Sequence, residues 1–214
     1  HELRTPVSVI RANSESLIDG ALEDEEAAKK FSTAILRNSE KLTRLLSDIL
    51  NLSTLESGEY TLDIRSTNVT PIISNVVSNL KEANPSIDIE VTINEDLNVM
   101  CDIQAFEQVM TNLIENGIKY GTTDNSNILL ISAKPLGQKM RFEIEDKGQG
   151  IPPAERKRVF ERFYRVQEKE VLENSGTGLG LSIVKNLVHL MDGSVGNEQA
   201  HPNGTIFWFT LNIE

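Results

Sequence analysis

The first six residues place a nucleophile beside a carboxylate. Glu2 follows His1 directly, and Thr5 lies four positions after His1. A neutral imidazole attacks a phosphorus atom through a free ring nitrogen, and a carboxylate that accepts the proton of the other nitrogen favours that tautomer. On a helix, His1 and Thr5 would share one face, and Pro6 would bend the helix because it cannot donate to the carbonyl of Glu2. His1 and Glu2 alone would equally describe a solvated surface pair.

A polar stripe later in the chain is suited to a nucleotide. Asn112, Asn116 and Lys119 lie four and three positions apart, on one side of a helix predicted over 105–120. The neighbouring side of this helix is apolar and comprises Phe106, Val109, Leu113 and Gly117. An amide oxygen is a ligand for Mg²⁺, which needs few protein ligands beside nucleotide phosphates, and a lysine reaches a phosphate. An ordinary polar helix surface would look similar.

Asp146 ends a predicted strand whose inward side is apolar. Met140, Phe142 and Ile144 alternate along 140–145, and Asp146 continues their side, just before Gly148 and Gly150. A buried carboxylate needs a donor, and the amino group of adenine is one, whereas guanine presents a carbonyl there. The pattern therefore predicts ATP rather than GTP, although an aspartate that caps a turn would read the same way.

Three glycines at alternate positions precede a predicted helix over 179–191. Gly176, Gly178 and Gly180 allow close approach of a phosphate, and the helix amino terminus favours negative charge. The polar stretch between Arg165 and Ser175 is predicted to form a lid over the site. Phe160, Phe163 and Tyr164 are the candidate anchors of this lid, and Arg162 or Arg165 could reach a terminal phosphate. A nucleophile and a phosphoryl-donor site on one chain suggest a protein that phosphorylates itself or a second copy.

Two regions of different pattern must position these groups. Residues 1–57 predict two helices, and the second carries a heptad stripe whose members are Phe31, Ile35, Asn38, Leu42, Leu45, Ile49 and Leu52. We favour a dimeric four-helix bundle to cover this stripe, with an intramolecular hairpin as the alternative. Residues 58–214 predict helices over 69–80, 105–120 and 179–191, and strands over 87–93, 128–133, 140–145 and 205–213. Since strands and helices do not alternate regularly, we expect an α+β sandwich with helices on one face of a mixed sheet.

Composition narrows the function classes. The net charge of −11, with 32 acidic and 21 basic residues, argues against direct binding to nucleic acid or to an anionic membrane surface. Cys101 is the sole cysteine, so an intramolecular disulfide is excluded and a reducing cytoplasmic setting is expected. No apolar run is long enough to span a bilayer, so any membrane attachment would come from segments upstream of His1.

Taken in order, these motifs resemble the cytoplasmic core of a bacterial two-component sensor histidine kinase. The stretch from His1 to Pro6 resembles the H box, 112–120 the N box, 146–150 the G1 box, 160–165 the F box and 176–180 the G2 box, while Gly204 and Thr205 resemble the last glycine motif. The resemblance implies a dimerisation and histidine-phosphotransfer domain, 1–57, followed by a Bergerat-type ATP-binding domain, 58–214. It also implies ATP and Mg²⁺ as cofactors, a homodimer, and the receiver domain of a response regulator as partner.

The same resemblance assigns roles to residues. It implies His1 as phosphoacceptor, Glu2 as its proton-handling partner and Thr5 as the residue that positions water during dephosphorylation of the regulator. It implies Asn116 as the Mg²⁺ ligand, Asn112 as its neighbour and Asp146 as the adenine acceptor. The further nucleotide contacts that it implies are Lys119, Tyr120, Gly148, Gly150, Ile151, Arg162, Phe163, Arg165, Gly176, Thr177, Gly178, Leu179, Gly180, Leu181 and Thr205.

The chain departs from the family pattern at Lys147, where asparagine is usual, and at Gln167, where aspartate is frequent. In the family a helical segment normally precedes the histidine, whereas this sequence starts at His1. Two other readings stay open: an ATPase of the gyrase, chaperone or mismatch-repair type, with Glu115 as general base for water, and a non-catalytic dimeric binding module.

Overall fold

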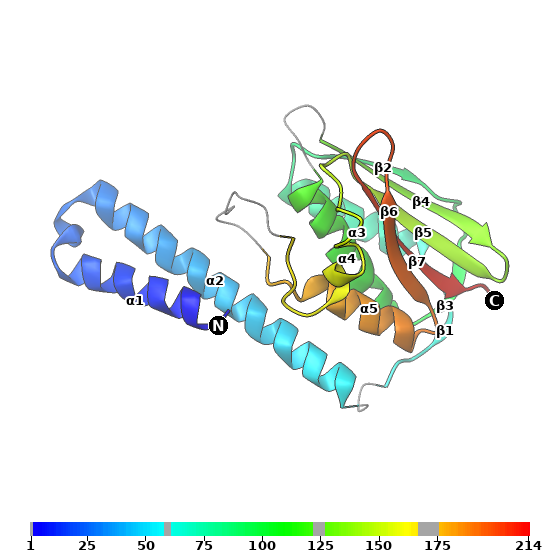
Figure 1. The fold of residues 1–214 in the computed structure, drawn as a ribbon, viewed down its shortest axis with the longest axis horizontal. Coiled ribbons are helices and arrows are strands. Elements are labelled where there is room, and N and C mark those ends of the chain that lie inside the picture. Colours follow the sequence, from blue (N-terminus) through cyan, green and yellow to red (C-terminus); the bar gives the residue numbers. More distant parts are fainter. Residues whose placement is uncertain (1, 58–60, 122–126, 167–175) are drawn as a thin grey trace.

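The computed structural model describes residues 2–57, 61–121, 127–166 and 176–214. A helical hairpin comes first: α1 (Arg4–Ile18), a 3₁₀ turn η1 (Ala21–Glu23) and the long α2 (Glu25–Glu56). α1 packs along the amino-terminal half of α2, and the carboxyl-terminal half of α2 reaches the second region (Figure 1). Asp24 begins α2 as its cap, because its carboxylate accepts hydrogen bonds from the backbone N–H groups of Glu26 and Ala27.

The helix predicted to carry His1 begins later than expected. α1 starts at Arg4, after a turn at Glu2 and Leu3, and His1 lies outside the described residues. Pro6 explains the start, because it cannot donate the hydrogen bond to the carbonyl of Glu2 that would extend the helix backwards. Pro6 therefore lies buried in the first turn of α1 and does not bend an established helix. The predicted shared helical face of His1 and Thr5 includes a residue outside the described range, so it stays a prediction.

The second region is an α+β sandwich, as predicted. Its helices are α3 (Thr70–Ala83), α4 (Ile103–Tyr120) and α5 (Gly180–Leu190), with a 3₁₀ turn η2 (Arg158–Phe160). Its strands are β1 (Arg65–Asn68), β2 (Asp88–Thr92), β3 (Asn98–Cys101), β4 (Ile128–Leu136), β5 (Lys139–Glu145), β6 (Ser194–Gln199) and β7 (Thr205–Asn212). The three helices lie on one side of the larger sheet (Figure 1).

The larger sheet is mixed and has the order β2-β4-β5-β7-β6, while β1 and β3 form a separate antiparallel pair. β2 runs parallel to β4, and the other neighbours are antiparallel. Phe106 of α4 packs edge-on against Phe142 of β5 and Phe209 of β7, with ring centroids 5.3 and 5.9 Å away. This aromatic cluster fixes α4 over the two central strands, so it also fixes the polar side of α4 relative to the ends of β5 and β7.

Three short strands were not predicted. β1, β3 and β6 have four, four and six residues, and β1 and β6 are mainly polar, so neither shows a clear apolar alternation. Pro135 lies inside β4, and the turn to β5 follows at Gly137. The strand tolerates Pro135 because β2 pairs with β4 only over 128–132, which leaves β4 an edge strand on that side.

Part of the predicted heptad stripe of α2 is buried within the chain itself, without a second copy. Leu45 and Leu52 are buried within the chain, in a core that they share with α5 and the rest of the second region. The other members of the stripe, Phe31, Ile35, Asn38, Leu42 and Ile49, are partly buried. The exposed apolar residues of α2 are different ones, Leu36, Leu46 and Leu50. The stripe that we assigned to a dimer seam is thus covered in part by the chain itself.

We expect Leu45→Ala to destabilise the second region, although Leu45 belongs to the first. Leu45 is 0% exposed, and truncation of a buried leucine costs about 2–5 kcal/mol of unfolding free energy. Urea unfolding followed by the fluorescence of Trp208, the one tryptophan, reports on β7 of the second region. The matched control is Leu46→Ala, because Leu46 is 54% exposed and should cost little. An unchanged Trp208 transition in Leu45→Ala would contradict a shared core.

Candidate functional site

α4 presents the predicted polar stripe next to its buried face. Asp102 caps the helix by accepting a hydrogen bond from the backbone N–H of Ala105, at 2.9 Å. The four residues of the predicted apolar side, Phe106, Val109, Leu113 and Gly117, are all buried. Asn112 and Asn116 are partly buried, and the side-chain nitrogen of Asn112 is a buried donor without a partner. A buried donor that lacks a protein acceptor suits a ligand oxygen.

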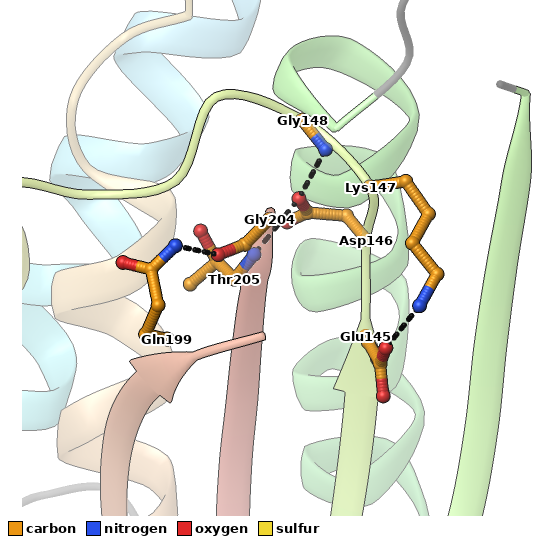
Figure 2. Close-up of polar contacts among 7 residues, drawn as sticks. All are labelled: Glu145, Asp146, Lys147, Gly148, Gln199, Gly204 and Thr205. Carbon is orange, nitrogen blue, oxygen red and sulfur yellow. Dashed lines mark hydrogen bonds and ion pairs between the residues drawn. The ribbon is translucent and has the colours of Figure 1, made fainter. Parts of the chain in front are cut away.

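Asp146 lies where the end of β5 meets the start of β7. Its side chain is only 5% exposed, and its Oδ1 accepts hydrogen bonds from the backbone N–H groups of Gly148, at 2.9 Å, and Thr205, at 3.0 Å (Figure 2). Among the described residues, no donor reaches Oδ2. Burial raises the pKa of Asp146, while the two backbone hydrogen bonds lower it in part. Asp146 therefore keeps one carboxylate oxygen available for a ligand donor in a poorly solvated position.

The neighbouring Lys147 turns away from this position. Its ammonium group pairs with the carboxylate of Glu145, on the other side of the strand from the partners of Asp146 (Figure 2). The lysine that replaces the usual asparagine of the family is thus held by an ion pair within the chain, and Asp146 keeps its inward direction.

The end of α4 touches Asp146 closely. A Cβ on Gly121 would lie 2.2 Å from the Cβ of Asp146, so only glycine fits there without displacement. A Cβ on Gly148 would likewise lie 2.6 Å from the carbonyl oxygen of Tyr120. These contacts bring the N-box and G1-box residues together. Gly121 was not among the predicted site residues, because a single glycine at a helix end is read as an ordinary terminator.

The glycine loop, residues 176–180, lies against the last turn of α4. The backbone N–H of Gly176 donates to the hydroxyl of Tyr120 at 3.2 Å, and a Cβ on Gly176 would lie 3.1 Å from the ammonium nitrogen of Lys119. At the other end of the loop, a Cβ on Gly180 would lie 3.7 Å from Oδ1 of Asn112. α5 begins at Gly180, so its amino terminus faces the polar side of α4, and the arrangement favours an anion between them.

The F-box segment is attached to the same loop. The backbone N–H of Phe163 donates to the carbonyl of Gly178 at 2.9 Å, while the Phe163 ring is 47% exposed. Phe160 is buried against Phe207, and Arg158 lies over the ring of Tyr164 at 4.2 Å. Phe160 and Tyr164 are thus packed against the fold and Phe163 projects outward, while their role as anchors of a lid stays a prediction. Most of the predicted lid, 167–175, lies outside the described residues, as does Gln167.

The segment after Asp146 is held by a network that sequence reasoning missed. Gly150 has a φ of +81°, and Arg156 donates to the carbonyl of Ile151 and to the side-chain oxygen of Gln199. Gln199 in turn donates to the carbonyl of Gly204 at 3.0 Å (Figure 2). The network ties the Gly150 turn to the loop before β7. No motif predicts it, because the hydrogen bond that joins its two parts links Arg156 and Gln199, which are 43 positions apart.

The predicted site residues thus form two groups. The polar residues of α4, the Asp146 turn and the glycine loop meet along the carboxyl-terminal half of α4. The F box joins the glycine loop through Phe163 and Gly178, while Arg162 lies beside Lys185 and Asn186 of α5. Glu2 and Thr5 lie at the amino-terminal end of α1, where Glu2 is partly buried and Thr5 is exposed. The described residues contain no cluster of three or more histidine, cysteine, aspartate or glutamate side chains placed to hold a metal ion. The helices in the described part of the chain include none long and apolar enough to cross a membrane.

Comparisons with known protein families match both regions. Residues 1–58 match the family described as the His Kinase A (phospho-acceptor) domain. Residues 101–214, more than half of the chain, match the family described as histidine kinase-, DNA gyrase B- and HSP90-like ATPase.

Individual relatives agree with these matches. The sensor histidine kinase WalK of Bacillus subtilis is 31% identical over 99% of this chain, which spans 35% of that protein. The sensor protein kinase WalK of Staphylococcus aureus is 30% identical over the whole chain, which spans 52% of that protein. Among solved structures, histidine kinase AdeS of Acinetobacter baumannii has a TM-score of 0.79 at 25% identity, covering 100% of this chain and 98% of that one. Histidine kinase ThkA in complex with response regulator protein TrrA gives a TM-score of 0.80 at 25% identity, with coverage of 100% and 59%.

We expect Asp146→Asn to keep the fold and to lose affinity for the adenine base of ATP. An asparagine Oδ1 still accepts from Gly148 and Thr205, but its NH₂ group would face the amino group of adenine, donor against donor. Loss of a hydrogen bond to a charged group costs about 1.5–3 kcal/mol, so we expect ATP to bind roughly 10- to 100-fold more weakly in equilibrium titrations. The ratio of GTP to ATP affinity should rise. Lys147→Asn is the matched control and should bind ATP as the parent does.

The raised pKa of Asp146 gives the same residue a pH signature. Below that pKa the carboxyl is protonated and accepts poorly, so ATP affinity of the parent should fall with decreasing pH above the ordinary value of 3.8. Because the folded-state pKa is raised, the free energy of unfolding of the ligand-free protein should increase as pH falls through this range. Asp146→Asn should lack the contribution of Asp146 to both changes, so its pH dependence should be weaker than that of the parent. Parallel pH profiles in the two proteins would contradict this account of Asp146.

Proposed function

The chain belongs to the bacterial two-component sensor histidine kinases, and from this membership we propose that it transfers the γ-phosphoryl group of ATP to His1. The observation that carries the proposal is the placement of the polar groups along α4. A buried carboxylate with one oxygen available, an unpaired amide donor, a lysine and a glycine loop at a helix amino terminus follow one another along the carboxyl-terminal half of α4.

These groups would divide the nucleotide between them. Oδ2 of Asp146 would accept from the adenine amino group, which favours ATP over GTP. Lys119, Tyr120 and the glycine loop would bind the phosphates, and the buried amide nitrogen of Asn112 would donate to a phosphate oxygen or to a water of the metal. Mg²⁺ would be held mainly by phosphates and water, with the Asn116 amide oxygen as the protein ligand, because this ion retains most of its waters. When bound, it would neutralise charge on the phosphates.

The transfer itself needs little covalent chemistry from the rest of the chain. One imidazole nitrogen of His1 forms a bond to the γ-phosphorus as the bond to the ADP oxygen breaks, and Glu2 takes up charge by accepting from the other ring nitrogen. The phosphoryl group would then pass to an aspartate of a response regulator. The structural similarity to ThkA, solved in complex with the regulator TrrA, supports that kind of partner.

We further propose a homodimer in which a second copy covers exposed apolar residues of the hairpin. Leu36, Leu46 and Leu50 lie on one exposed side of α2, and Val7 and Ile18 of α1 are exposed as well. The division at 57/58, the separate ATP-binding domain, and a cytoplasmic location where ATP is supplied are parts of the same proposal. The ATPase reading, with Glu115 as base, is less favoured because it gives no use to the matched phosphoacceptor region.

We expect His1→Gln to abolish labelling by γ-labelled ATP and Mg²⁺ while leaving nucleotide binding intact. The parent should acquire an acid-labile, alkali-stable label, which is the behaviour of a phosphoramidate. ATP titration of both proteins is the control, since His1 is not among the groups proposed to bind nucleotide. ATP hydrolysis without labelling of the parent would favour the ATPase reading instead.

We expect Thr5→Ala to slow dephosphorylation of the cognate regulator and to spare autophosphorylation. Thr5 is exposed near the start of α1, so its hydroxyl is available to position a water molecule. The measurement is loss of label from the phosphorylated regulator, with Ser8→Ala, an exposed hydroxyl further along α1, as the matched control. Equal dephosphorylation rates in the parent and Thr5→Ala would refute the role of Thr5.

A further inference from the structure

α2 reaches the glycine loop through a hydrogen bond between side chains. The hydroxyl of Thr177 donates to Oδ2 of Asp48 at 2.8 Å and accepts from the backbone N–H of Leu179 at 3.2 Å. Below this contact, Leu52 and Leu55 of α2 are buried in the core that includes α5. The loop is thus fixed on one side by α2 and on the other by Tyr120 of α4, so it spans the two helices.

Lys119 lies beside this loop, with its ammonium nitrogen 3.1 Å from a Cβ built on Gly176, and three further cations act on Lys119 electrostatically. We call the four side chains the cation cluster: Lys41, Arg44, Lys119 and Arg165. Burial lowers the pKa of Lys119 most; the charge of Arg44 lowers it next, Glu115 raises it, and Arg165 and Lys41 lower it further. Burial raises the pKa of Asp48, while the hydrogen bond from Thr177 and the charge of Arg44 lower it in part. Arg44 lies one helical turn before Asp48 and Lys41 two turns before it, so all three share the face of α2 that meets the loop.

The four cations of the cluster outnumber the two carboxylates that act on them, Asp48 and Glu115. Within the described part of the chain, none of the four belongs to an ion pair with a carboxylate. One carboxylate oxygen of Asp48 already accepts a hydrogen bond from Thr177. Like charges gathered at a site repel one another, and this cost is offset when a polyanion binds between them. Lys119 and the glycine loop are proposed to bind the phosphates of ATP. The triphosphate of ATP is therefore the polyanion that would lie within reach of the cluster.

We propose that Arg44, assisted by Lys41, is a phosphate-binding residue that the phosphoacceptor helix supplies to the nucleotide site, and that Asp48 positions the glycine loop beside it through Thr177. The inference rests on the proposed function, since it deepens the account of the same ATP site. It implies that nucleotide affinity depends on a side chain outside the ATP-binding region. It also implies that bound ATP strengthens the contact between α2 and that region.

The test is equilibrium binding of MgATP to the whole chain, measured by calorimetry over a range of salt concentrations. Arg44→Gln should weaken ATP binding about three- to tenfold and reduce its salt dependence, since an exposed charge–phosphate contact contributes roughly this much. Arg44→Lys should restore most of the affinity and the salt dependence, because it retains the charge. Arg37→Gln removes the same charge two turns earlier on α2, away from the loop, and should bind as the parent does.

The outcomes separate the inference from the proposed function. A parent chain that does not bind MgATP would overturn both. A parent that binds MgATP, with Arg44→Gln equal to it in affinity and salt dependence, would overturn the inference alone. Equal weakening by Arg37→Gln and Arg44→Gln would also overturn it, because the effect would then be one of net charge on α2 and not of a placed phosphate ligand.

Discussion

The rest of the site depends on the burial of one carboxylate, Asp146. A carboxylate removed from water is stable only when it receives hydrogen bonds, and the backbone of Gly148 and Thr205 supplies two of them to a single oxygen. These two donors come from the turn after β5 and the start of β7, which are adjacent only because the sheet pairs those strands. The sheet order therefore creates the acceptor, and the second oxygen is left to a ligand.

The same burial dictates how closely other segments approach. The end of α4 lies so near Asp146 that Gly121 leaves no space for a side chain, and Gly204, with a φ of +112°, would place a Cβ 2.0 Å from the Asp146 carbonyl oxygen. Close packing of these backbones draws the amide stripe of α4 and the glycine loop to the same side of the sheet. The site is thus assembled by backbone approach, and side chains with long reach, such as Lys119, complete it.

Much of this arrangement could be predicted, because its causes are local. Strand alternation placed Asp146 inward, and helical spacing separated Asn112 and Asn116 from the buried side of α4. The short polar strands β1 and β6 escaped prediction because pairing with neighbours, not their own pattern, makes them strands. The hydrogen bond between Asp48 and Thr177 escaped it because 129 positions separate the two residues and neither has an unusual local context. The heptad stripe was recognised from its period. The period predicts that one face of α2 is buried, but it does not tell whether a second copy or the second region of the same chain covers that face.

That ambiguity in α2 has a physical consequence for the two regions. One face of α2 carries Leu45, Leu52 and Asp48 against the second region, while Leu36, Leu46 and Leu50 face outward. Because the two faces differ, docking of the second region on α2 does not use the outward leucines. In the proposed homodimer, a single helix can therefore contact the nucleotide-binding region and a second copy at the same time.

Movement of the second region along α2 would have to break the hydrogen bond between Thr177 and Asp48, beside the proposed phosphate site. It would also have to expose Leu45, which belongs to the core that the two regions share. The stability of this docked arrangement is thus coupled, through the glycine loop, to whatever occupies the site.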